Sequence, residues 1–141
     1  MTVKFSGVVK AGNISPDVMP RFAYTAAETM SVGDIVAKGE SNDRVVLAKA
    51  DDSTRMPAIG AVQSLGSGSI VYIVTAGIMR SISRLANFGF DQALYVSTTA
   101  GKVTTSPPDG LDNFVQNVGR SITATDGMLG IDETVLQIKQ A

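Results

Sequence analysis

The hydrophobic positions along this chain occur in short runs separated by polar, glycine-containing stretches. The clearest run is Ile70–Val74, whose β-branched and aromatic residues favour a strand and whose continuous apolar character indicates burial on both faces. The polar stretch 39–43 separates two further apolar runs, 35–36 and 45–47, an arrangement typical of a β-hairpin. Because many short strands alternate with glycine turns, the pattern predicts an all-β fold, a compact barrel or sandwich of short antiparallel strands.

One segment of the chain favours a helix instead. Ile78, Ile82 and Leu85 have helical spacing, and Arg80 and Arg84 lie between them. We therefore expect at most one short helix, over about residues 78–85, or a loop with one turn of helix. The one-turn spacing of the two arginines would let both contact an acidic partner surface, although a solvated helix face explains the same spacing more simply.

The chain contains an internal repeat, in which residues 92–134 follow the pattern of residues 33–75 at a constant offset of 59 residues. Ile59-Gly60, for example, falls on Val118-Gly119. Repeated strands and turns are typical of a scaffold, whereas a catalytic site needs polar groups that converge at one place. We therefore expect residues 23–141 to form a single β domain with an internal pseudo-repeat.

Residues 1–22 differ from the rest of the chain. Pro16 and Pro20 interrupt regular structure and push the residues before them toward extended geometry. We interpret this segment as an extended N-terminal arm, and an ordinary first strand packed on its own domain is an equally good interpretation. The apolar side chains that such an arm would offer to a partner are Val3, Phe5, Val8, Val9, Ile14 and Met19.

Charge and hydropathy exclude two classes of partner. The 141 residues include 13 acidic and 12 basic side chains, with a formal net charge of −1 and no basic stripe, so we expect no nucleic-acid partner. The amino terminus lacks the apolar run of a signal peptide, and the most apolar stretch, 70–78, is too short to span a bilayer. These features predict a protein made in the cytoplasm without a membrane partner.

The residue types that carry most enzyme chemistry are missing. The chain has no histidine, cysteine or tryptophan, which excludes Ser–His and Cys–His nucleophiles and thiolate metal sites. Two carboxylate pairs, Asp51 with Asp52 and Asp109 with Asp112, could in principle serve a carbohydrate site. Both pairs lie in polar loops, where charged residues are usually solvated. We therefore expect no enzyme activity, no metal, no cofactor and no small-molecule substrate.

Several segments share one pattern of hydrophobic residues and glycines: Gly33-Asp34-Ile35-Val36, Ala58–Val62, Ile70–Gly77, Leu94-Tyr95-Val96, Gly101-Lys102-Val103 and Val118-Gly119-Arg120. With these segments, the strand pattern over about residues 22–134 resembles the capsid decoration (cement, or head-stabilising) proteins of tailed bacteriophages. The resemblance implies a structural virion protein that forms homotrimers over local three-fold positions on the capsid surface. It also implies that the major capsid protein is the partner and that the N-terminal arm adds to its surface.

Two alternatives remain open. Phage fibre and baseplate modules use strings similar to those of the second unit, so a trimeric tail-fibre or baseplate module is the first alternative. The second is a small carbohydrate-binding domain that would use the loop aspartates. The absence of tryptophan and the small number of aromatic residues disfavour it, because sugar-binding clefts are normally lined by aromatic side chains.

Overall fold

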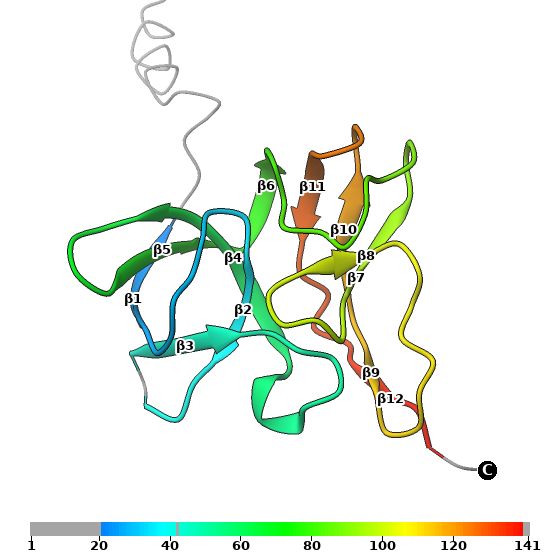
Figure 1. The fold of residues 1–141 in the computed structure, drawn as a ribbon, viewed down its shortest axis with the longest axis horizontal. Coiled ribbons are helices and arrows are strands. Elements are labelled where there is room, and N and C mark those ends of the chain that lie inside the picture. The colour runs from blue at the N-terminus through cyan, green and yellow to red at the C-terminus, as the bar shows by residue number, and fades with distance from the viewer. Residues whose placement is uncertain (1–20, 42, 140–141) are drawn as a thin grey trace, which may run out of the picture.

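The computed structural model describes residues 21–41 and 43–139, and these residues form an almost entirely β structure (Figure 1). The all-β class predicted from the sequence is confirmed, including a closed barrel of short strands. The predicted arm lies outside the described residues except for Arg21 and Phe22. Within the described part of the chain, the one helical element is a 3-10 turn, Ser53–Arg55.

The first five strands form the closed barrel, in the order β1–β3–β2–β4–β5. β1 lies parallel to β3 and antiparallel to β5, and these two pairings close the sheet on itself. All the other neighbours in the barrel are antiparallel, and two of these pairs, β2–β3 and β4–β5, are consecutive strands joined by short turns. The five strands are β1 (Phe22–Ala26), β2 (Ile35–Lys38), β3 (Arg44–Leu47), β4 (Ala58–Leu65) and β5 (Ile70–Val74).

The next strands form a second sheet beside the barrel, in the order β6–β11–β10–β7–β8. Only Thr75 separates β5 from β6, so the chain passes from the barrel directly into the second sheet (Figure 1). A short ribbon of β9 (Phe114–Val115) and β12 (Leu136–Gln137) completes the fold. The strands of the second sheet are β6 (Ala76–Met79), β7 (Ala93–Val96), β8 (Val103–Thr104), β10 (Asn117–Ser121) and β11 (Gly127–Gly130).

The second sheet repeats the strand order of the barrel. β3, β2, β4 and β5 of the barrel correspond in order to β8, β7, β10 and β11. In the barrel, the parallel pairing of β1 with β3 places Thr25 opposite Arg44. In the second unit an isolated parallel bridge joins Arg84 to Val103, each 59 residues further along the chain. The segment after β6 therefore takes the place that β1 holds in the barrel.

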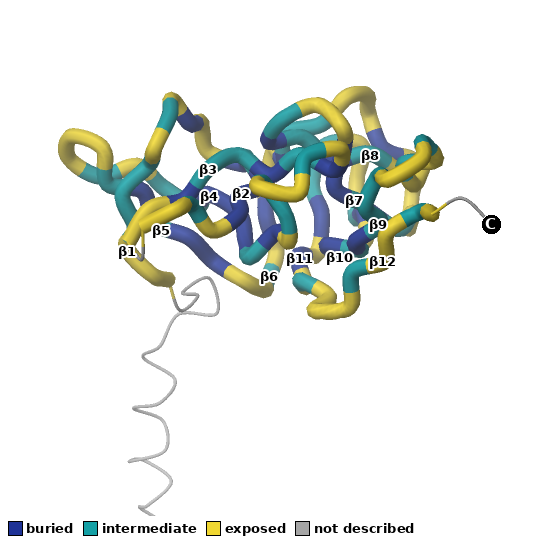
Figure 2. Tube along the Cα trace, turned by 90° about the horizontal axis from the view of Figure 1, so that it is seen from below, coloured by how far each residue is buried: buried dark blue, intermediate teal, exposed yellow. Residues whose placement is uncertain are grey.

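The two units share one hydrophobic cluster, and a second cluster fills the interior of the barrel. Val36 and Val62 point into the barrel, whereas their neighbours Ile35 and Ala61 pack outward against the second unit, because successive side chains of a strand point to opposite faces. Figure 2 shows buried residues along β4 and in strands of the second sheet, such as β7 and β10. The second unit contributes to this shared cluster Met79, Ile82, Phe88, Leu94, Val96, Val103, Val118 and Leu129.

The helix predicted over residues 78–85 is wrong. Residues 76–79 form β6, which pairs with β11 and places Ile78 opposite Met128. Ser81 then adopts a positive φ of 55°, which a helix does not allow. Ile82 is buried, whereas Ile78 and Leu85 are exposed, so the three side chains do not form one apolar face. The free edge of β11 decided the structure here, because helical spacing in so short a segment is weak evidence.

Candidate functional site

The loop carboxylates considered for carbohydrate binding serve local structure. Asp51 lies 2.9 Å from the ammonium of Lys49, and the carboxylate of Asp52 accepts hydrogen bonds from the backbone and the hydroxyl of Thr54. Asp112 pairs with Lys139 at 3.1 Å, and Asp109 is exposed in its loop. The described residues contain no group of three or more acidic side chains that could hold a metal ion. Asp51, Asp52 and Asp112 therefore make local contacts in turns and surface ion pairs.

A further acidic residue, Glu28, was not singled out by the sequence analysis. Its carboxylate accepts hydrogen bonds from the Arg55 guanidinium and from the Leu47 backbone N–H, the latter at 3.0 Å, and Arg55 also donates to the Leu47 carbonyl at 3.1 Å. Desolvation by burial raises the pKa of Glu28, but the hydrogen bonds and the charge of Arg55 together lower it. A carboxyl with a lowered pKa stays ionised at neutral pH, so this cluster fastens β3 to the 3-10 turn and is a poor general acid.

The same electrostatics predict how stability depends on pH. The Ser81 backbone N–H and the Thr125 hydroxyl donate to Asp126 and hold the pKa of its carboxyl below the usual range. Such a carboxyl is protonated first in the unfolded chain, so its contribution is complete above the unfolded pKa and is lost as pH falls through the folded pKa. Because the chain has no histidine, we expect level stability from about pH 5 to 8 and a decline below about pH 4.

Urea unfolding at a series of pH values would measure this dependence. The matched variant is Asp126→Asn, which keeps an oxygen acceptor for the Ser81 N–H and removes the titrating group. We expect a shallower decline in acid for this variant than for the wild-type protein. A stability maximum near pH 6.5, or an unchanged decline in the variant, would contradict the assignment.

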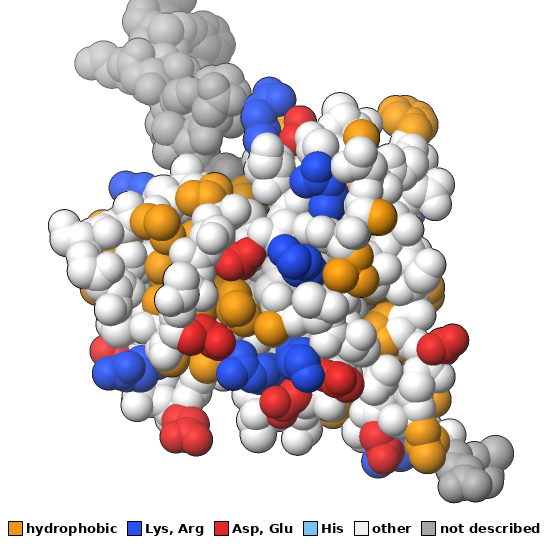
Figure 3. Space-filling view, in the orientation of Figure 1, with side chains coloured by type: hydrophobic (Ala, Val, Ile, Leu, Met, Phe, Trp, Pro, Cys, Tyr) orange, Lys and Arg blue, Asp and Glu red, His pale blue; other side chains and the backbone are white. Residues whose placement is uncertain are grey.

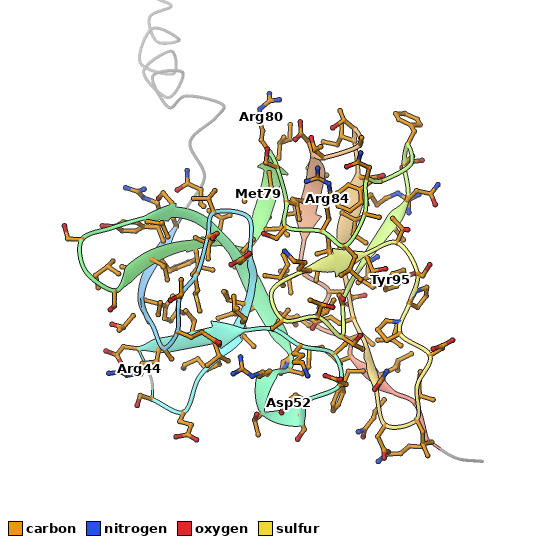
Figure 4. All side chains as sticks on the ribbon, in the orientation of Figure 1. Arg44, Asp52, Met79, Arg80, Arg84 and Tyr95 are labelled. Carbon is orange, nitrogen blue, oxygen red and sulfur yellow. The ribbon has the colours of Figure 1, made fainter. Side chains whose placement is uncertain are left out.

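Arg80 and Arg84 do not form a joint contact surface. Arg80 lies 3.5 Å from Asp126, whereas Arg84 donates to the Asn87 side chain at 3.1 Å and to the Ile82 carbonyl at 3.2 Å. Figure 4 shows Arg80 projecting beyond the end of β6 and Arg84 lying lower, over the body of the protein. On the face drawn in Figure 3, acidic and basic side chains are intermingled and hydrophobic side chains are scattered. The helix on which the two arginines would share a face is absent from the described residues 78–85, so their sequence spacing does not bring them together.

The most distinctive surface feature is an apolar groove where the start of β4 diverges from β6. Two hollows of about 590 Å³ and 210 Å³ adjoin there and share Ile59 and Thr75 as lining residues. Ile59 falls at a register shift between β2 and β4, where Val36 faces Gly60 but Ala37 faces Ala58. Such a bulge re-aims the side chain of the extra residue. We call this feature the β4–β6 groove.

The lining of the β4–β6 groove suits an extended peptide better than a reacting substrate. Its walls are mainly apolar, with Ile59 on one side and Ile131 on the other. Lys38 lines the smaller hollow and Glu133 the larger one, so the groove carries opposite charges in its two parts. The amide of Gln116, which also lines the groove, is already bonded to the backbone. Apolar pockets with a few placed polar groups are typical of ligand-binding sites in general, and an extended peptide binds by placing alternate side chains in such pockets.

The sequence did not reveal this groove, because its residues come from distant parts of the chain and a bulge sets the direction of Ile59. Pro57, just before β4, was the one local signal. The residues predicted to bind a capsid lie outside the described residues, so the structure does not place them relative to the groove. They are Val3, Phe5, Val8, Val9, Ile14 and Met19.

Comparison with known proteins adds no name to this site. Across residues 21–41 and 43–139, no helix is long and apolar enough to cross a membrane. The chain matches no protein-family model, no curated protein and no solved structure.

Proposed function

We propose that this protein is a structural component of a tailed-phage virion that binds the outer surface of the capsid and stabilises it, as a homotrimer. Its partner is the major capsid protein, and residues 1–22 supply the attaching arm. The observation that carries the proposal is the tandem of two β units with the same strand order joined through one core. Such a tandem gives a stable platform, and Asp51, Asp112 and Arg80 on its surface are engaged in local ion pairs.

The physics of attachment fits a protein of this kind. An extended arm gains affinity by adding backbone hydrogen bonds and apolar side chains to a partner's surface. Many identical copies on a symmetric shell convert weak single contacts into strong collective attachment. A ligand that binds the assembled shell and not its separated parts stabilises the shell by mass action.

Electron microscopy of source virions labelled with an antibody fragment against this chain tests the proposal. We expect label over the head. Purified capsids lacking the protein should bind the full-length chain and lose binding when residues 1–20 are deleted, with circular dichroism confirming that the truncated chain is folded. Label confined to the tail would favour the fibre or baseplate alternative, and full binding by the truncated chain would exclude the arm.

A further inference from the structure

The β4–β6 groove lies where the N-terminal segment joins the barrel. Phe22, the second described residue, lines the smaller hollow together with Tyr24 and Lys38. Residues 1–20 are therefore tethered at the end of the groove that carries the lysine. The larger hollow continues from the shared residues Ile59 and Thr75 toward Glu133. A segment that runs along the groove from its tether would pass a cation first and a carboxylate last.

The charged and apolar residues of the tethered segment follow one another in the order that complements the groove. Reading back from Phe22, it presents Asp17 first, then the apolar Ile14, and then Lys10. We propose that residues 10–17 lie along the β4–β6 groove of their own chain, with Asp17 beside Lys38, Ile14 against Ile59 and Ile131, and Lys10 beside Glu133. This inference concerns the free protein and does not rest on the proposed virion function.

Reach and stiffness favour this occupant. Lys10 and Asp17 are seven positions apart, so an extended chain places their side chains up to about 23 Å apart. A proline disfavours helical backbone at the residue before it, so Pro16 and Pro20 would reduce the entropy that the segment loses on docking. Because the segment is covalently attached at the groove, its effective concentration is in the range of about 1 mM or more, which favours it over a free competitor.

A disulfide test separates docking within one chain from exchange between chains. The protein has no cysteine, so Lys10→Cys with Glu133→Cys creates a single possible pair. The matched control is Lys10→Cys with Ser67→Cys, because Ser67 is exposed in the turn that joins β4 to β5 at the opposite end of the barrel. We expect the groove pair to form an intramolecular disulfide at least about tenfold faster than the control pair, because docking raises the local concentration.

Three outcomes would overturn the proposal. Equal rates for the two pairs would mean that the segment samples the surface without docking. A disulfide-linked dimer that forms faster than the monomeric product would assign the groove to the segment of a second copy. Absence of any disulfide at the groove would leave the groove to another partner. Since the measurement uses the purified full-length chain without capsids, its failure is distinct from a failure to bind virions.

Charge reversal gives a second, independent measurement. The chain has no tryptophan, so Ile14→Trp provides a single fluorescent reporter, which is expected to be shielded from acrylamide when the segment is docked. Glu133→Lys should increase quenching by placing like charges at the far end of the groove, and Lys10→Glu in the same chain should restore the shielding. Glu133 is exposed, so its replacement leaves the core intact. Equal quenching in all three proteins would overturn the proposed pairing of Lys10 with Glu133.

Discussion

Gln116→Ala is expected to lower the free energy of unfolding by about 3 kcal/mol or more, because it leaves several buried polar groups without partners. The Gln116 side chain is fully buried and forms the hydrogen bonds to the Ala58 backbone that a neighbouring strand would otherwise make. Its carbonyl oxygen accepts from the Ala58 N–H at 2.7 Å, and its amide donates to the carbonyls of Ala58 and Asp132 at 3.0 Å and 2.9 Å. The side chain thereby fastens the start of β4 to the second unit.

Thermal unfolding followed by circular dichroism would measure this loss, which corresponds to a fall in Tm of about 10 °C for a chain of this size. The matched control is Gln137→Ala, which removes an amide that donates to the Asp112 carbonyl at 3.0 Å on the exposed surface. We expect the control to change stability by no more than about 0.5 kcal/mol. Similar stabilities for the two variants would show that water replaces the lost partners of Gln116.

The sequence predicted the elements whose signal is local. The strand at Ile70–Val74 and the hairpin around residues 39–43 both depend on neighbouring residues, and both are present as β5 and as the β2–β3 pair. The helix over residues 78–85 failed because an open strand edge outweighed a weak periodicity. Local patterns succeed where local propensity and tertiary pairing agree, and they fail where the two conflict.

The candidate groove and the anchoring role of Gln116 could not be predicted from the sequence. Gln116 bonds to Ala58, which lies 58 positions earlier in the chain, and a polar residue between two strands reads as a loop or an exposed position. Ile59 faces the groove because of a one-residue register shift, and a shift of one residue moves a side chain to the opposite face of a strand. Neither feature has a pattern in the neighbouring residues.

The second large effect on stability is expected at the glycine that the two repeats share. Gly60 and Gly119 occupy equivalent positions of the two units, 59 residues apart. A Cβ on Gly60 would lie 2.5 Å from the Val74 carbonyl oxygen, and a Cβ on Gly119 would overlap the Met128 carbonyl oxygen. Gly119 also has a φ of 152°, which L-residues rarely adopt. Each glycine therefore lets its strand approach the neighbouring strand closely.

Gly119→Ala is expected to destabilise the protein by about 3 kcal/mol, because the obstacle is backbone and cannot move aside as a side chain would. Gly130→Ala is the matched control on the neighbouring strand, since nothing lies within 4 Å of a Cβ added there. Alanine at this open position should be neutral within about 0.5 kcal/mol, or slightly stabilising through the unfolded chain. Urea unfolding of both variants measures the difference. If Gly119→Ala were as stable as Gly130→Ala, β10 and β11 would have room to separate, and the repeated glycine would reflect turn formation rather than close approach.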